Sequence, residues 1–323
     1  MKKIKIGILG CADIAKRMII PNLLKTGKFE IVAFGSRTIN KATEYSSLFG
    51  GMPIEGYNKL IEIKEIEAIY IPLPTGMHYE WIIKCLNNGK HIFSEKSIAT
   101  NFKEVSNIIE IAKKKNLCVF ENFMFPFHSQ IEFIKDKINN NEIGEVRLLK
   151  SSFGFPIFNK DNNIRYKKEL GGGSLLDAGA YTLMASQIFL GEKQRVISSA
   201  LNNLDSDVDF LGSITLLNED NIVSQLSFGF DNFYQNNIEI WGSKGKILAN
   251  RAFTAGPNHL PNVIIERHGE INNYQLSSDN HFIKILNEFY FSITKGNYSR
   301  QFNQILSQAK LLSEAREKNI LIS

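Results

Sequence analysis

The chain has few cysteines and no cluster of histidines. Its 323 residues include three cysteines, Cys11, Cys85 and Cys118, whose spacing fits neither a zinc site nor a disulfide framework. The six histidines, at positions 78, 91, 128, 259, 268 and 281, form no pattern of metal ligands. We therefore expect no metal site and a reducing, cytoplasmic compartment.

The sequence also lacks a membrane segment and a long basic region. No stretch reaches the roughly 18 apolar residues of a membrane span. Met1-Lys2-Lys3 and the apolar run to Leu9 imitate a signal peptide, but Lys5 interrupts the run, which we interpret as a buried first strand. The 38 Lys and Arg against 33 Asp and Glu leave a net charge of +5, and the basic clusters are short. We expect neither a membrane nor a nucleic acid as a partner.

The first part of the chain alternates between strand and helix patterns. Strands are expected at Lys3 to Leu9, Glu30 to Phe34, Met52 to Ile54, Ala68 to Ile71, His91 to Ser94 and Leu117 to Glu121. Helical spacing of apolar residues is present in Ile14 to Leu24, Lys41 to Phe49, Tyr79 to Asn87 and Phe102 to Lys115. This alternation predicts βαβ units and a parallel sheet, as in an α/β Rossmann domain.

After Glu121 the pattern changes to longer alternating runs. Strands are expected at Glu145 to Phe155, Gln194 to Leu201, Phe210 to Leu217, Ile222 to Phe230, Gln235 to Trp241, Lys246 to Asn250 and Asn262 to His268. Helices are expected at Ser129 to Asn139, Ser174 to Phe189, Asp279 to Thr294 and Gln301 to Glu317. These patterns predict an α+β domain with a large, mainly antiparallel open sheet. We expect two domains, residues 1–122 and 123–323.

A loop of small residues follows the first expected strand. In Gly10-Cys11-Ala12-Asp13-Ile14-Ala15, the positions of a G-x-G-x-x-G loop are held by Gly10, Ala12 and Ala15. Gly10 would make the tight turn, and the N-terminus of the next helix would offer N–H groups to a pyrophosphate. The loop alone also fits a plain strand-turn-helix, but its place at the start of a βαβ repeat favours a dinucleotide.

The end of the second strand bears on the choice of cofactor. NAD-binding versions place an acidic residue there, whereas this chain has Ser36-Arg37-Thr38. Ser36 can hydrogen-bond a 2′-phosphate, and the Arg37 guanidinium can stack on adenine and pair with that phosphate. This pattern favours NADP over NAD. The alternative is that Arg37 is a surface residue that opens the next helix.

Three further segments carry a family resemblance. They are Ala68-Ile69-Tyr70-Ile71-Pro72-Leu73-Pro74-Thr75-Gly76-Met77-His78, Gly89-Lys90-His91-Ile92-Phe93-Ser94-Glu95-Lys96-Ser97 and Leu170-Gly171-Gly172-Gly173-Ser174-Leu175-Leu176-Asp177-Ala178-Gly179-Ala180-Tyr181. With the loop at Gly10, they make the sequence resemble the Gfo/Idh/MocA oxidoreductases over essentially its whole length. The resemblance implies an NAD(P)-binding Rossmann domain, followed by a substrate-binding domain whose open sheet commonly pairs subunits into a homodimer or homotetramer.

The resemblance also implies roles for individual residues. Lys96 would be catalytic, because its ammonium can stabilise the alkoxide that forms as hydride arrives. Glu95 would orient this turn or pair with Lys96. The expected cofactor-binding residues are Gly10, Cys11, Ala12, Asp13, Ile14, Ser36, Arg37, Pro72, Leu73, Pro74, His78, Glu95 and Lys96. Without this context, a lysine at a strand end is most often a solvated surface residue.

The sequence departs from the family pattern at two positions. Ser97 stands where the family usually has a proline, commonly after a cis bond, which leaves the isomer of this peptide open. Tyr181 stands where the family commonly has histidine, four residues after Asp177. On an α-helix these two residues lie on one face, and Ser174 with Asp177 resembles a capping box. The alternative for Tyr181 is a half-buried tyrosine that only packs.

The tyrosine form of this motif is similar to a subgroup of sugar-nucleotide 3-ketoreductases and of NADP-dependent aldose and dihydrodiol dehydrogenases. The segments around Phe153, Arg165 and Asp177 favour the ketoreductases. Our first hypothesis is NADP-dependent reduction of a keto group, at C3, of a deoxysugar linked to a nucleoside diphosphate. The substrate-binding residues would be Phe153, Arg165, Asp177 and Tyr181, with Arg165 or Lys168 at the diphosphate. The alternatives are an aldose or dihydrodiol dehydrogenase and a non-catalytic dinucleotide-binding regulator.

The chemistry predicts a division of labour between two residues. Hydride addition leaves an alkoxide that must be protonated. We expect Tyr181 to deliver this proton and Lys96 to bind the ketone oxygen and lower the tyrosine pKa, which is near 10 in water. Asp177 would then hold a substrate hydroxyl. Whether the tyrosine or the lysine is the donor stays open, as do the sugar, the nucleotide and the face that receives hydride.

Overall fold

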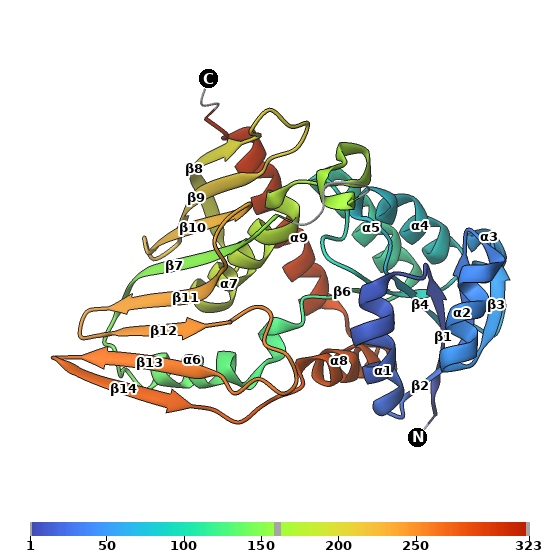
Figure 1. The fold of residues 1–323 in the computed structure, drawn as a ribbon, viewed down its shortest axis with the longest axis horizontal. Helices are drawn as coiled ribbons and strands as arrows, with labels where there is room; N and C mark the ends of the chain where they lie inside the picture. The colour runs from blue at the N-terminus through green and yellow to red at the C-terminus, as the bar shows by residue number, and fades with distance from the viewer. Residues whose placement is uncertain (1, 158–162, 321–323) are drawn as a thin grey trace. The chain divides into compact units, whose positions relative to one another are not determined.

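The computed structural model describes residues 2–157 and 163–320, and these form two compact units (Figure 1). The first unit contains the residues up to Phe123 and also Phe282–Leu306. The second contains Met124–His281 and the residues from Ser307 onward. These units are groups of residues in contact, and each combines segments that are distant in sequence. The expected domains, 1–122 and 123–323, are continuous segments, and the division into these two domains stays a prediction.

The first unit holds a parallel sheet of six strands, as expected for a Rossmann fold. Its order is β3-β2-β1-β4-β5-β6, and every pair is parallel. The strands are β1 (Ile4–Leu9), β2 (Phe29–Ser36), β3 (Met52–Glu55), β4 (Ala68–Ile71), β5 (His91–Ser94) and β6 (Val119–Glu121). The order reverses between β1 and β4, and ligands of such sheets bind outside the carboxyl ends of the strands at this point.

The helices of the first unit connect these strands. They are α1 (Ile20–Lys25), α2 (Ile39–Phe49), α3 (Tyr57–Ile61), α4 (Thr75–Asn87) and α5 (Phe102–Lys115), with α8 (His281–Lys295) added from late in the chain. The bounds of α5 match those expected, because the Asn101 side chain caps its first turn by accepting the N–H of Glu104 and Asn116 ends it with φ 54°. The short α3 was not expected.

Helix α8 contributes to the apolar core of the first unit. The ring of Phe289 is fully buried and packs on Phe29 of β2, Phe93 of β5 and Phe120 of β6, with centroid distances of 6.0, 5.1 and 5.9 Å. Aromatic rings at this spacing bury much apolar surface and stabilise a core. The core of the first unit therefore includes residues from both ends of the sequence.

The second unit holds a sheet of eight strands in the order β14-β13-β12-β11-β7-β10-β9-β8. The strands are β7 (Val146–Phe155), β8 (Gln194–Asn202), β9 (Leu211–Asn218), β10 (Val223–Phe230), β11 (Gln235–Gly242), β12 (Lys246–Asn250), β13 (Asn262–Arg267) and β14 (Glu270–Gln275). All pairs are antiparallel except β7 with β10. This confirms the expected fold class. Strand β14 was missed, because Glu-Ile-Asn-Asn-Tyr-Gln is mostly polar.

Helices in the second unit are α6 (Ser129–Asn139), α7 (Ala180–Leu190) and part of α9 (Ser299–Glu317), whose first turns belong to the first unit. Helix α7 carries no strong polar face, and its residues from Ala180 to Gln187 are all buried. Such a helix lies inside a core. Among the helices that the structure describes, none is long and apolar enough to cross a membrane.

Candidate active site

The loop after β1 turns at Gly10, as expected from the sequence. Gly10 has φ 116°, which side chains rarely tolerate, and a Cβ at this position would lie 2.8 Å from Leu73 Cδ2. Its N–H donates to the carbonyl of Gly35 at 2.9 Å. Ala15 is fully buried, as expected for the third position of the motif. Gly10 is therefore fixed by the close approach of Leu73, one of the residues expected to bind the cofactor.

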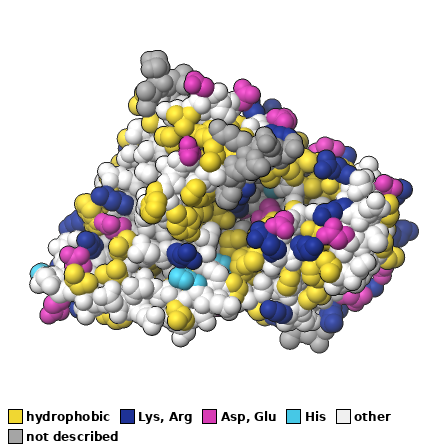
Figure 2. All heavy atoms as spheres, viewed as in Figure 1, with side chains coloured by type: hydrophobic (Ala, Val, Ile, Leu, Met, Phe, Trp, Pro, Cys, Tyr) yellow, Lys and Arg dark blue, Asp and Glu magenta, His cyan; other side chains and the backbone are white. Residues whose placement is uncertain are grey.

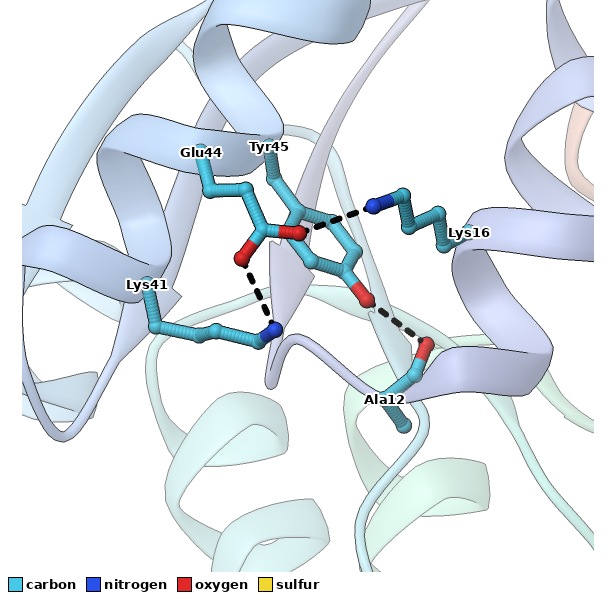
Figure 3. Close-up of polar contacts among 5 residues, drawn as sticks. All are labelled: Ala12, Lys16, Lys41, Glu44 and Tyr45. Carbon is cyan, nitrogen blue, oxygen red and sulfur yellow. Dashed lines mark hydrogen bonds and ion pairs between the residues drawn. The ribbon is translucent and has the colours of Figure 1, made fainter.

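Helix α2 holds this loop through a group of residues that the sequence did not single out (Figure 3). The Tyr45 hydroxyl donates to the carbonyl of Ala12 at 3.1 Å. Lys16 and Lys41 each donate to Glu44 at 2.8 Å, and these bonds lower the pKa of Glu44 to about 2. The polar residues of α2 follow no recognisable motif in the sequence, so the sequence did not indicate these contacts. Acidic and basic side chains also lie next to one another over the first unit in Figure 2.

The end of β2 carries Ser36 and Arg37 as expected. Ser36 is buried and lies close enough to Cys11 to lower the pKa of its thiol; Cys11 belongs to the loop from Gly10 to Ala15, here called the phosphate loop for its expected role. Burial raises the pKa of the Cys11 thiol to about 11, opposed by Lys41 and by Ser36. Arg37 is exposed. The two loops at this edge of the sheet are thus joined, and a cation stands where an acid would select NAD.

The turn after β5 holds Lys96 next to a buried polar network. The carboxylate of Glu95 accepts from the Tyr70 hydroxyl at 2.6 Å and from Asn122 Nδ2 at 2.8 Å. Burial raises the pKa of Glu95, and the two bonds lower it. Lys96 also lowers the pKa of Glu95, so both roles expected for Glu95, orienting the turn and pairing with Lys96, stay predictions. The Lys96–Ser97 peptide bond is cis.

His78 lies in the interior of the first unit. Its side chain is fully buried, and its two ring nitrogens lie 2.8 Å from the carbonyl oxygen of Ser97 and 2.7 Å from that of Leu73. Both nitrogens are therefore engaged by the protein. The expected contact of His78 with the cofactor stays a prediction.

Tyr181 and Asp177 belong to the second unit, whereas Lys96 belongs to the first. Tyr181 is 7% exposed and packs on Phe153, Phe125 and Phe253, with ring centroids 5.1, 5.9 and 5.7 Å away. Its hydroxyl points to Met124 Sδ at 3.9 Å. Tyr181 therefore lies in a largely aromatic environment, and its expected catalytic role stays a prediction.

Arg165 and Asp177, both expected at the substrate, form an ion pair. Arg165 Nε donates to Asp177 Oδ2 at 2.6 Å, and the guanidinium lies 5.9 Å from the Phe155 ring centroid. Both side chains are partly exposed. The structure thus joins these two residues to each other.

The start of the Tyr181 helix differs from the expected capping box. Residues Leu175–Gly179 form a π-helix, so the α-helical spacing between Asp177 and Tyr181 does not apply there. Ser174 makes no capping bond, and its hydroxyl donates to Asp209 Oδ2 at 2.7 Å. Asp209 also accepts the N–H of Leu175 at 2.6 Å. The cap comes from a residue distant in sequence, which no local pattern could indicate.

Comparison with known proteins identifies relatives over the whole chain. The model of the Gfo/Idh/MocA oxidoreductases with an NAD-binding Rossmann fold matches residues 4–123, and that of the Gfo/Idh/MocA C-terminal domain matches residues 131–248. The dTDP-3,4-didehydro-2,6-dideoxy-alpha-D-glucose 3-reductase of Actinomadura kijaniata is 35% identical over 315 residues, 97% of this chain and 95% of that protein. The enzyme of the same name from Saccharopolyspora spinosa is 36% identical over 296 residues, 91% and 89% of the two chains.

A solved structure is similar over the same length. The crystal structure of KijD10, a 3-ketoreductase from Actinomadura kijaniata in complex with NADP and TDP-benzene, matches with a TM-score of 0.95 at 34% identity and covers 98% of each chain.

The cap on the Tyr181 helix can be tested by mutation. We expect Asp209→Ala to lower the free energy of unfolding by about 1 to 3 kcal/mol, because the Leu175 N–H and the Ser174 hydroxyl lose their acceptor. Asp207→Ala, two residues away at an exposed position, should change it by less than about 0.5 kcal/mol. Urea denaturation measures both, and equal values for the two variants would contradict the cap.

Proposed function

The chain belongs to the Gfo/Idh/MocA oxidoreductase family, and from this premise we propose that it is an NADP-dependent 3-ketoreductase of deoxysugars linked to a nucleoside diphosphate. The observation that carries the proposal is the similarity to the dTDP-sugar 3-reductases over nearly the whole of each chain. The residues expected to do the chemistry, Lys96 and Tyr181, are present. We also place the enzyme in the cytoplasm, since all three cysteines are free.

The first unit fits a nicotinamide dinucleotide. Gly10 keeps the loop free of a side chain where backbone must approach a pyrophosphate, and the helical turns behind Ala12 begin at that loop. We assign Ser36 and Arg37 to a 2′-phosphate, and the residues Cys11, Asp13, Ile14, Pro72, Leu73 and Pro74 to the rest of the cofactor. When bound, NADPH supplies the hydride.

The chain's own residues would bind the ketone and manage its proton. The Lys96 ammonium, on the turn held by Glu95, stabilises negative charge on the substrate oxygen. Tyr181 donates the proton from an apolar wall, where a neighbouring cation is needed to bring its pKa toward neutrality. We assign Phe153 to the sugar ring, and Asp177 with Arg165 to a substrate hydroxyl and the diphosphate. The ion pair fixes the guanidinium fork, and a fixed fork suits bidentate contact with phosphate.

The catalytic assignment predicts activity on one class of substrate and its loss in two variants. We expect oxidation of NADPH with a dTDP-3-keto-deoxysugar and none with free pentoses or hexoses, read as loss of absorbance. Tyr181→Phe should lower kcat by about 10² to 10⁴, the usual size of a lost general acid. Lys96→Met should be at least as damaging.

Three results would contradict parts of this assignment. Turnover of free aldoses but of no nucleotide-linked sugar would show that the substrate is a free aldose. A near-normal kcat in Tyr181→Phe would mean that Lys96 or a water molecule, and not Tyr181, is the proton donor. Binding of NADPH without turnover of any sugar tested would favour a regulator. The fluorescence of bound NADPH serves as the control for folding in both variants.

The preference for NADP predicts a selective loss in Arg37→Ala. We expect kcat/KM with NADPH to fall by about 10- to 100-fold, the range for a hydrogen bond to a charged group, and kcat/KM with NADH to stay nearly constant. Lys59→Ala removes an exposed charge on α3 and should leave both values unchanged. A wild-type enzyme that uses NADH as efficiently as NADPH would contradict the assignment of NADP as the preferred cofactor.

We further propose that the open face of the eight-stranded sheet pairs subunits. Large apolar side chains are exposed along this sheet and its hairpins: Ile197 at 44%, Leu211 at 37%, Phe233 at 87%, Trp241 at 38% and Ile271 at 62%. A hollow of about 500 Å³ lies near Leu211 and Phe233. Apolar surface of this extent commonly marks an interface.

Light scattering at micromolar concentration tests the pairing. We expect a mass that is two or four times the 36.6 kDa of the chain. Phe233→Asp should shift the distribution toward the monomer, whereas Phe291→Asp, on α8 of the other unit, should not. A wild-type protein that is monomeric would refute the proposal.

A further inference from the structure

The peptide group between Ser97 and Ile98, the second one after Lys96, is hydrogen-bonded on both sides by buried ionisable side chains. The carbonyl oxygen of the Ser97–Ile98 peptide lies 2.8 Å from His78 Nδ1. The N–H of the same peptide donates to Glu121 Oε1 at 2.8 Å. The His78 side chain comes from α4 and Glu121 is the last residue of β6, so two elements grip one peptide. Both residues are buried, His78 completely and Glu121 to 9% exposure.

The surroundings of His78 decide its protonation state. Its other ring nitrogen, Nε2, lies 2.7 Å from the carbonyl oxygen of Leu73. Carbonyl oxygens only accept hydrogen bonds, and a neutral imidazole carries a single N–H. Only the imidazolium can therefore donate to Leu73 and Ser97 together. Burial lowers the pKa of His78 below its ordinary value, and the two carbonyl bonds oppose this shift only in part. Against this lowering, a neutral ring would place a bare nitrogen against a carbonyl oxygen in a fully buried site, which is costly.

Glu121 supplies the opposite charge on the far side of the peptide. Burial raises the pKa of its carboxyl group to about 8, while the Ile98 N–H and the nearby Lys96 lower it. An imidazolium at His78 would lower the Glu121 pKa further and so favour the carboxylate. A buried cation is costly unless an anion compensates it. Here the cation polarises the C=O and the anion accepts the N–H of one amide, so the two bonds strengthen each other.

Among the described residues, Lys96 and Glu95 are the other charged groups on this turn. Lys96 is the cation that acts on both His78 and Glu121. Glu95, on the turn that precedes the peptide, is engaged by Tyr70 and Asn122. The Lys96 ammonium therefore favours the carboxylate of Glu121 and opposes the imidazolium of His78, which makes Glu121 the compensating charge for both cations.

We propose that His78, as an imidazolium, and Glu121, as a carboxylate, are positioning residues that fix the Ser97–Ile98 peptide and, through it, the Lys96 side chain. His78 also ties this turn to the Leu73 loop, which itself touches Gly10. The chain of contacts runs from the phosphate loop to the catalytic turn without reaching solvent. This inference rests on the proposed catalytic role of Lys96, but the ionisation of His78 can be measured without any substrate.

Nuclear magnetic resonance of protein labelled with ¹⁵N in histidine tests the pair directly. The His78 signals are assigned as those absent from His78→Gln. We expect both ring nitrogens of His78 to be protonated at pH 7.5, above the ordinary histidine pKa of about 6.5. In Glu121→Gln, which keeps an acceptor for the Ile98 N–H but removes the charge, the His78 pKa should fall. Glu104→Gln is the matched control, because the Glu104 carboxylate also accepts a backbone N–H, that of Thr100. This variant should leave the pKa of His78 unchanged.

Kinetics test the link to Lys96. Glu121→Gln should lower kcat by about 10- to 100-fold, the cost of a misplaced catalytic group, with little change in the Kd for NADPH. A His78 ring with one bare nitrogen in the wild type would overturn the proposal, as would a Glu121→Gln variant with normal kcat or with unaltered His78 ionisation. If the wild type reduces no keto-sugar, the proposed function fails, while the resonance measurement still decides the ionisation of His78.

Discussion

The parallel pairing of six strands is the constraint on which the first unit depends. Because all six run the same way, their carboxyl ends lie along one edge of the sheet, and the chain must turn there after every strand. The Gly10 loop follows β1, Ser36 ends β2, Leu73 follows β4 and Lys96 follows β5. Groups scattered over almost ninety positions of sequence are thereby brought to one edge by backbone hydrogen bonding alone.

The crowding of polar groups at this edge has to be resolved inside the protein. Glu95 is partly buried, and its carboxylate accepts hydrogen bonds from a hydroxyl on β4 and from an amide on the residue after β6. Each neighbouring strand thus provides a partner for the turn after β5. Such networks specify one arrangement, since a partner left unpaired in a buried site costs about 1 to 3 kcal/mol.

Sequence reasoning recovered those features that depend on local pattern. Helix α5 and strands β4 and β5 have the expected bounds, because apolar period, caps and turn residues agree within each segment. The contacts that hold the candidate site together could not be predicted from local sequence patterns. Tyr45 bonds the loop that contains Ala12, and Asp209 bonds the start of the helix that contains Tyr181, so each contact joins positions more than thirty residues apart. Both residue types are common on protein surfaces, so neither stands out in the sequence.

The two π-helical segments show a further limit of local pattern. Ala15–Ile19 follows the phosphate loop and Leu175–Gly179 precedes Tyr181. An apolar period near 3.6 predicts a helix in both places and cannot report a widened turn, which tertiary contacts must hold open. Both segments border residues assigned to ligands, in keeping with the frequent occurrence of such turns at functional sites.

The return of the chain to its first unit has a consequence for synthesis of the protein. Domains of a growing chain generally fold in order as they leave the ribosome. Here Phe29, Phe93 and Phe120 emerge early, but Phe289, the ring that packs on all three, is made after the entire eight-stranded sheet. Measured along the chain, the second unit is largely an insertion within the first. The nascent Rossmann sheet therefore keeps an apolar face uncovered until Phe289 has been made, so the first unit cannot be completed before most of the second unit has been synthesised.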